Sequence, residues 1–276
     1  MTRSEIILSL SATVLFCGCG GAPGPASASG SAAQVPPSTT QTPTPPTLGN
    51  WQFNATSTVP GKPPLTFAGS VGRAGTAVTS ALHVDGSNCF DRLTTISFTS
   101  TVTGNSTSLT SATIDGQVVT FTGNFSGYAF NGTYKINGGC DAGDQGTLTG
   151  VNVWNIGNNL SGTFTDSAQR TFNVVGKIAE SDSASSDGSF GITGTTTFNT
   201  PCFSAGTIQP GTYPSGSFIL GTSVALEAET SNGLLTFLGT LNQDGSGGLK
   251  GNYTVSGGDC DESGTADLQV AGAWDY

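Results

Sequence analysis

Hydrophobic and polar positions alternate in short runs along most of the chain. In the first such run Trp51, Phe53 and Ala55 occupy every second position, with polar residues between them. A period of two is typical of antiparallel strands that bury one face and expose the other to water. Turn-forming pairs such as Asp85-Gly86 separate the runs and indicate tight hairpins. The pattern therefore predicts an all-β protein.

The alternating region is duplicated. Residues 130–141 read Phe-Asn-Gly-Thr-Tyr-Lys-Ile-Asn-Gly-Gly-Cys-Asp, and residues 249–261 read Leu-Lys-Gly-Asn-Tyr-Thr-Val-Ser-Gly-Gly-Asp-Cys-Asp. We therefore predict two tandem β domains, residues 48–154 and 155–276, each with about eight strands. Trp154 fits both the end of the first copy and the start of the second, so the boundary is ambiguous by one strand.

Glycine recurs on the inward face of equivalent strands. Gly123 lies between two large apolar residues in the first copy, and Gly239 does so in the second. Glycine inside a strand marks a bend or a place where a ring lies over the backbone. The repetition favours antiparallel up-and-down β-barrels for both domains, with β-sandwiches as the alternative.

One disulfide is expected in each domain. Four cysteines permit three pairings, and the duplication favours Cys89 with Cys140 and Cys202 with Cys260. Such bridges persist in oxidising compartments. The chain lacks a Cys-x-x-Cys pair, which a zinc site usually requires, so we expect no metal site on these cysteines.

The N-terminus carries an export signal. Residues 1–19 contain Arg3, a short apolar stretch and a final Cys17-Gly-Cys19. The stretch is too short for a permanent bilayer span. It resembles a bacterial lipoprotein signal, in which the cysteine is acylated, and Gly18 before Cys19 fits that pattern. The resemblance implies lipidation at Cys19 and a lipid-anchored place in the bacterial cell envelope, with the membrane face left open. Ordinary secretion with cleavage within residues 22–33 is the alternative.

Residues 20–47 consist mostly of Gly, Ala, Ser, Pro, Thr and Gln. This composition cannot bury a core and predicts a disordered tether between the anchor and the folded domains.

Charge excludes one class of partner. The net charge is −10, and the eight Lys and Arg residues are scattered. Nucleic-acid binding needs a basic stripe, so we expect no nucleic-acid partner.

No catalytic constellation is recognisable, and we expect no enzyme activity, catalytic residue or cofactor. His83 is the single histidine, and its alternation with Leu82 and Val84 predicts that it faces water. Ser70 lies in Ala-Gly-Ser-Val-Gly, which lacks the first glycine of a nucleophile elbow. Acidic residues beside the second cysteine of each pair are interpreted as turn residues, with calcium binding as the alternative; they are Asp141, Asp144, Asp259, Asp261 and Glu262.

Two resemblances bear on function. The Cys pair in each domain and Gly-x-Tyr leading to Gly-Gly-Cys resemble uncharacterised bacterial exported lipoproteins with tandem disulfide-stapled β domains. Gly49-Asn50-Trp51 resembles the first-strand Gly-x-Trp of lipocalin-type and avidin-type barrels, in which the tryptophan is mainly a packing residue. These resemblances supply no activity. The lipid anchor, the tether and the absence of a catalytic constellation predict a non-enzymatic, lipid-anchored envelope protein that acts as a binding or structural module.

Two alternative functions remain at this stage. The inward aromatic and glycine pattern is compatible with a barrel that holds a small apolar ligand, which would need an internal cavity. The Thr- and Asn-rich exterior is compatible with a glycan-binding or adhesive surface, which exposed aromatic side chains would support.

Overall fold

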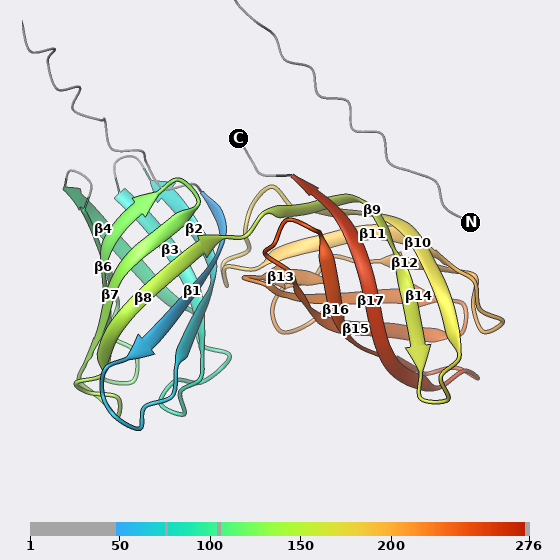
Figure 1. The fold of residues 1–276 in the computed structure, drawn as a ribbon, viewed down its shortest axis with the longest axis horizontal. Helices are drawn as coiled ribbons and strands as arrows, with labels where there is room; N and C mark the ends of the chain where they lie inside the picture. Colours follow the sequence, from blue (N-terminus) through green and yellow to red (C-terminus); the bar gives the residue numbers. More distant parts are fainter. Residues whose placement is uncertain (1–47, 75–76, 104–105, 274–276) are drawn as a thin grey trace, which may run out of the picture. The chain divides into compact units, whose positions relative to one another are not determined.

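The computed structural model describes residues 48–74, 77–103 and 106–273. The predicted signal peptide, the tether and Cys19 lie outside these ranges. No helix in the described part of the chain has the length and hydropathy needed to cross a bilayer. The described chain is all β and forms two closed antiparallel barrels in tandem, which confirms the predicted fold class (Figure 1).

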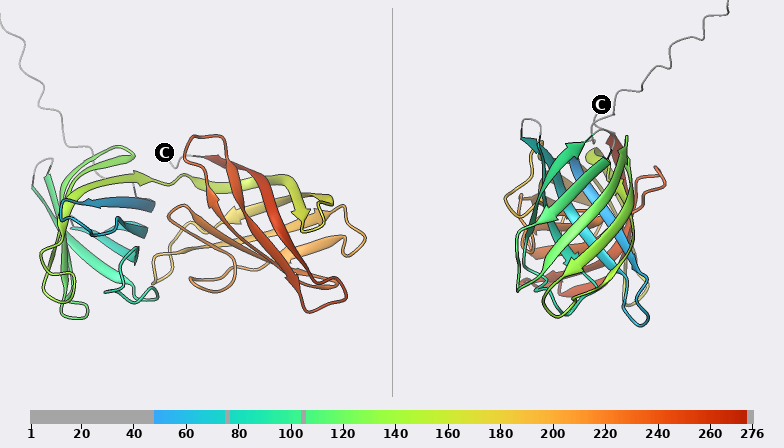
Figure 2. Two further views of the ribbon diagram at one scale, coloured as in Figure 1. Left: turned by 60° about the horizontal axis from the view of Figure 1, so that its bottom comes forward. Right: turned by 90° about the vertical axis from the view of Figure 1, so that its left-hand side faces the viewer.

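The first barrel is an up-and-down meander of eight strands, closed by pairing of the first strand with the eighth. Its strands are β1 (Gly49–Ser57), β2 (Leu65–Ala74), β3 (Ala77–Asp85), β4 (Ile96–Thr103), β5 (Ser106–Ser111), β6 (Val118–Ser126), β7 (Ala129–Asn137) and β8 (Gln145–Asn152). The strands run obliquely around the barrel, as the right-hand view of Figure 2 shows.

The second barrel begins at Asn155 and repeats this arrangement with one insertion. Its strands are β9 (Asn155–Asp166), β10 (Thr171–Glu180), β11 (Phe190–Phe198), β12 (Ala205–Ile208), β13 (Phe218–Leu220), β14 (Ser223–Thr230), β15 (Gly233–Leu241), β16 (Gly248–Ser256) and β17 (Glu262–Ala273). Pairing of β10 with β11 closes the ring, while the short β13 pairs with both β11 and β14.

Aromatic side chains occupy much of the first barrel's interior. Trp51 stacks on Phe53 with 5.5 Å between ring centroids, and Phe121 contacts Phe53, Phe67 and Phe98 at 4.8–5.7 Å. These rings are at most 1% exposed, so each contributes a large apolar area to the core. The second barrel has its own core, and Trp154, ambiguous from the sequence, packs there.

The inward glycines allow these rings to lie close to the backbone. Gly123 in β6 is directly opposite Gly132 in β7, and Gly239 in β15 is directly opposite Gly251 in β16. A Cβ atom at Gly123 would lie 2.7 Å from Cζ of Phe130, which is closer than real side chains approach. The glycine pattern that favoured closed barrels therefore reflects both the close approach of the paired strands and a ring packed against the backbone.

Both predicted disulfides are present. Cys89 is bonded to Cys140 and Cys202 to Cys260, each with 5.8 Å between Cα atoms. Each bridge lies within one barrel and joins segments that are 51 and 58 residues apart in the sequence, respectively.

Hydrogen bonds also connect the two barrels. The buried side-chain amide of Asn50 accepts a bond from the N–H of Gly221 at 2.7 Å and donates one to its carbonyl at 2.9 Å. The backbone N–H of Thr222 donates to Oε1 of Gln52 at 3.2 Å. These contacts satisfy backbone groups of the second barrel with side chains of β1 in the first.

Candidate functional site

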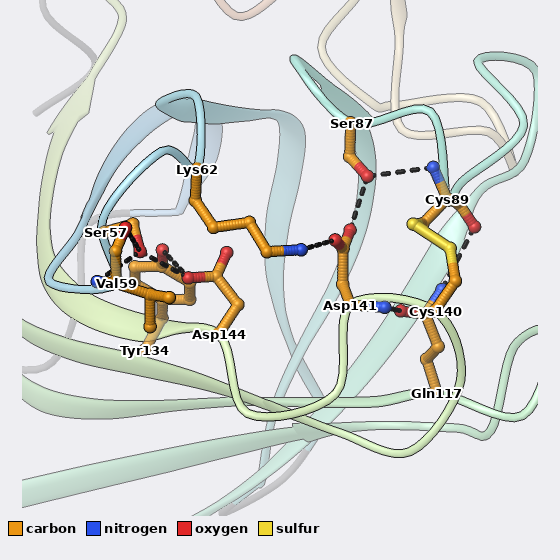
Figure 3. Close-up of polar contacts among 10 residues, drawn as sticks. All are labelled: Ser57, Val59, Lys62, Ser87, Cys89, Gln117, Tyr134, Cys140, Asp141 and Asp144. Carbon is orange, nitrogen blue, oxygen red and sulfur yellow. Dashed lines mark hydrogen bonds and ion pairs between the residues drawn. A yellow bond between two sulfur atoms is a disulfide. The ribbon is translucent and has the colours of Figure 1, made fainter.

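The most concentrated group of buried polar side chains lies at one end of the first barrel. There the connection between β7 and β8 carries Asp141 and Asp144, which are only 5% and 2% exposed. Gly138 and Gly139 begin this connection with φ of 77° and 59°, a conformation that glycine adopts most easily. The turn brings Cys140 to Cys89 and directs both carboxylates toward the neighbouring hairpins (Figure 3).

Asp141 connects three separate segments of the first barrel. Its carboxylate accepts a hydrogen bond from Nζ of Lys62 at 2.7 Å and another from Oγ of Ser87. Its backbone N–H donates to Oε1 of Gln117 at 3.2 Å, and Nε2 of Gln117 donates to the carbonyl of Cys89 at 3.0 Å. The hydrogen bond to Asp141 raises the pKa of the Lys62 amine, so this amine stays charged at neutral pH.

Asp144 forms a second group beside the first. Its Oδ1 accepts hydrogen bonds from Oη of Tyr134 at 3.1 Å and from Oγ of Ser57 (Figure 3). Ser57 Oγ in turn accepts the backbone N–H of Val59 at 2.9 Å. Burial, with the negative charge of Asp144, raises the pKa of Tyr134 to about 12. The phenol therefore remains a hydrogen-bond donor over the whole physiological pH range.

The second barrel has a related but altered arrangement. Tyr253 is directly opposite Gly264, as Tyr134 is opposite Gly146, and in each barrel an acid lies two residues before that glycine. Accordingly, Oη of Tyr253 donates to Oε1 of Glu262, at 3.4 Å.

Ser57 is paired with Gly146 in the first barrel, and Asp166 is paired with the equivalent Gly264 in the second. Asp166 therefore occupies the position of Ser57. Asp166 accepts hydrogen bonds from the backbone N–H of Arg170 at 2.8 Å and from its Nε at 2.6 Å. Burial acts to raise the pKa of Asp166, but these bonds outweigh it and lower the pKa.

The polar groups at the end of the first barrel are paired with one another rather than directed at a shared open space. Asp141 is neutralised by Lys62, and Asp144 is held by two hydroxyl donors. Among the described residues, no group of three or more His, Cys, Asp and Glu side chains is placed to hold a metal ion. The arrangement is suited to tying the hairpins of this end together.

A shallow groove runs over the outer face of β6, β7 and β8. Its volume is about 580 Å³, and its lining is rich in threonine: Thr58, Thr120, Thr122, Thr133, Tyr134, Lys135, Asn137, Gln145, Gly146 and Thr147. The one aromatic residue of this lining, Tyr134, is buried and engaged with Asp144. A sugar ring would therefore find hydroxyl and amide groups in this groove, without an exposed ring on which to stack.

The prediction for His83 was wrong. Its side chain is 6% exposed, and its Nε2 lies 2.9 Å from the carbonyl oxygen of Asp187, while the ring packs on Tyr213 with 4.6 Å between centroids. Strand alternation correctly placed His83 on the outer face of β3. It could not indicate that residues of the second barrel cover that face.

The sequence drew attention to some of these residues and missed others. The four paired cysteines and the two acids after Cys140 were singled out, and the acids are part of the site. Lys62, Ser57 and Gln117 were not, because nothing local distinguishes them from other polar loop and strand residues. The recurrence of a tyrosine followed by an acid in both copies was an available signal.

Comparisons with known proteins assign no family. No family model matches the chain, and no curated protein matches it. Among solved structures, the crystal structure of kievitone hydratase from Nectria haematococca (C2 SG) is similar with a TM-score of 0.25 and 8% sequence identity, over 82% of this chain and 90% of that one. A similarity this low supports no statement about function.

Proposed function

We propose that this protein is a non-enzymatic, lipid-anchored component of the bacterial cell envelope, whose two barrels form a binding or structural module. The observation that carries the proposal is the pair of disulfides, one in each barrel. Small domains retain such bridges in oxidising compartments and rarely in the cytosol. The apolar leader that ends at Cys19 supplies the anchor in this proposal, and the Pro/Ser/Thr-rich tether separates the barrels from the membrane surface.

Two features support a role without catalysis. The single histidine, His83, is buried with Nε2 against a backbone carbonyl. The buried carboxylates of the first barrel, Asp141 and Asp144, are held by Lys62, Ser87, Ser57 and Tyr134. General acid–base chemistry requires a group that reaches the substrate, and these groups are directed at one another. Reproducible turnover of ester or glycoside substrates by the purified full chain would contradict this part of the proposal.

The anchor can be tested with two adjacent cysteines. Cells that express the chain are fed an alkyne-labelled fatty acid, and the label on the purified protein is measured. We expect Cys19→Ser to abolish labelling and to release the protein from the membrane fraction. Cys17→Ser is the matched control and should leave labelling unchanged. Labelling that is absent from the wild type, or that depends on Cys17 alone, would overturn the assignment of Cys19.

A second candidate function is favoured by one observation inside the first barrel. Although aromatic rings fill much of that interior, two buried hydroxyls in β3 and β4 lack partners among the described residues. A barrel that binds a small, largely apolar molecule accounts for these hydroxyls.

A further inference from the structure

Two serine hydroxyls inside the first barrel have no hydrogen-bond partner among the residues that the structure describes. Ser80 in β3 and Ser100 in β4 are each 6% exposed, and the Oγ atom of each is buried and unpaired. Burial of a hydroxyl without a partner is unfavourable, so buried polar atoms in native proteins are nearly always matched by protein, water or ligand. The two hydroxyls therefore require a partner that the described residues do not supply, which is either water or a ligand.

The two hydroxyls lie close enough to share one ligand group. Ser80 is directly opposite Phe98 across the β3–β4 pair, and Ser100 is two residues further along on the same inward face. Diagonal neighbours of this kind have Cα or Cβ separations of about 7 Å. A single oxygen between them could accept a hydrogen bond from both hydroxyls, or accept from one and donate to the other.

The surroundings select an apolar and uncharged occupant. Ser80 is also opposite Val71, and Ser100 is opposite Leu109, and both neighbours are at most 2% exposed. Asp141 and Asp144, the buried charged groups of the described part of this barrel, belong to the β7–β8 connection, whereas Ser80 and Ser100 lie in the middle of β3 and β4. An ionised ligand would thus lack a counter-charge at this place.

The described part of the second barrel has no unpaired inward hydroxyl, although Nε1 of Trp154 in its core also lacks a hydrogen-bond partner. Its inward hydroxyl on β11, that of Thr196, is 4% exposed and donates to the carbonyl of Gly206 at 3.3 Å. The hydroxyl is therefore satisfied by the chain itself. The difference confines the inference to the first barrel, although the two barrels derive from one duplicated unit.

We propose that the first barrel binds a small uncharged molecule with an apolar body and one hydroxyl or carbonyl group, which is held between Ser80 and Ser100. This inference rests on the binding role in the proposed function and names the class of ligand. The apolar body would contact the aliphatic side chains of Val71 and Leu109, and the oxygen would supply the missing hydrogen-bond partners. Such a site recognises its ligand by one polar group in an otherwise hydrophobic pocket.

The test is a titration followed by two-dimensional NMR of the full chain carrying Cys19→Ser, which removes only the proposed lipidation site. The probes are cyclohexanol, cyclohexanone and methylcyclohexane, which have similar sizes but differ in the presence of an oxygen. We expect shifts of the β3 and β4 amide signals, and binding of both oxygen-containing probes about tenfold or more tighter than that of the hydrocarbon. Ser80→Ala with Ser100→Ala should abolish this preference.

Ser97→Ala is the matched control, because Ser97 is exposed on the same strand β4 and should leave the preference unchanged. If the double variant fails to fold, the wild-type comparison of cyclohexanol with methylcyclohexane still decides the question. Equal binding of alcohol and hydrocarbon, no shift in β3 and β4, or a crystal structure of the chain soaked in cyclohexanol with only water between the hydroxyls would overturn the proposal. Fatty-acid labelling at Cys19 reports on the anchor independently, so the two proposals can fail separately.

Discussion

The phenol of Tyr134 donates a hydrogen bond to the carboxylate of Asp144, with 3.1 Å between Oη and Oδ1, at the end of the first barrel that carries the β7–β8 connection. Tyr253 and Glu262 form the equivalent pair in the second barrel, where the corresponding distance is 3.4 Å. The duplicated unit therefore carries a tyrosine–carboxylate contact, and this contact is more buried in the first copy than in the second.

Removal of this contact should weaken the first barrel more than the second. Tyr134→Phe leaves Oδ1 of the buried Asp144 with Ser57 as its remaining side-chain donor, so we expect a loss of about 1–2 kcal/mol in the free energy of unfolding. Tyr253→Phe is the control, and its loss should be smaller because Glu262 is half-exposed. Urea unfolding measures both. Equal losses in the two variants would count against this interpretation.

The same contact should be visible in the alkaline titration of the phenols. The chain has five tyrosines, and burial raises the pKa of Tyr134 to about 12 and raises that of Tyr253 as well. Because the folded pKa exceeds the unfolded one, stability is fully present below about pH 10 and decreases as the pH rises toward 12. The titration is followed by the absorbance of the phenolate band in the wild type and in Tyr134→Phe. The variant should lack one of the steps that the wild type shows at high pH. Loss of an early step instead would refute the assignment.

Acid should affect the second barrel through Asp166. Hydrogen bonds from Arg170 outweigh burial and lower the pKa of this carboxyl, so its contribution is present above about pH 4 and is lost as the pH falls further. Asp166→Asn keeps the shape and one acceptor oxygen, and it should flatten the decrease of stability between pH 5 and pH 2. Urea midpoints across this range give the slope. A slope unchanged from that of wild type would show that other carboxylates govern acid unfolding.

The two disulfides should make similar contributions to the free energy of unfolding of their barrels. The bridged residues are 51 and 58 positions apart, so on the loop-entropy account each bridge stabilises by about 4 kcal/mol. We expect Cys89→Ser with Cys140→Ser to destabilise the first barrel by about this amount, and the corresponding double variant at Cys202 and Cys260 to destabilise the second. Unfolding in urea, monitored separately by NMR signals of each barrel, provides the measurement. A destabilisation far below this value would mean that the unfolded chain is already compact.

The glycine opposite Gly132 should not tolerate a methyl group. In Gly123→Ala the new Cβ would clash with the carbonyl oxygen of Asn131 in the paired strand and would lie 2.7 Å from Cζ of Phe130. Both the strand and the ring must therefore move, and we expect a cost of about 1–3 kcal/mol. Gly72→Ala in β2 is the control, because the nearest atom to its Cβ would be 3.5 Å away. Thermal unfolding should separate the two variants clearly. Similar melting temperatures would show that the β6–β7 pair can separate enough to admit a methyl group and would contradict the prediction.

The duplication made the architecture predictable. Two copies with one cysteine pair each reduced the disulfide pairing to one arrangement, and inward glycines beside large apolar residues favoured closed barrels over sandwiches. Both predictions depend on periodicity and internal comparison, which a single sequence supplies. The acids after Cys140 were also noticed, because they lie next to a recognisable cysteine.

Other parts of the site could not be predicted because they depend on distant contacts. Lys62 meets Asp141 across 79 residues, and its position in a polar loop gives no indication of this pairing. His83 illustrates a second limit: alternation assigns a side chain to one face of a strand, but not the segment that later covers that face. The unpaired state of Ser80 and Ser100 likewise depends on register, since a serine in a strand normally needs no explanation.

The ion pair at the end of the first barrel joins residues distant in sequence, whereas that of the second joins close neighbours. This difference affects how a protease would degrade the protein. In the first barrel Lys62 reaches Asp141 from another hairpin, whereas in the second Asp166 and Arg170 belong to a single turn. A protease that cut the β1–β2 loop near Lys62 would detach that residue's segment from its carboxylate partner and loosen the first barrel. The turn-local pair of the second barrel would survive the same cut, so proteolysis is expected to begin in the first barrel.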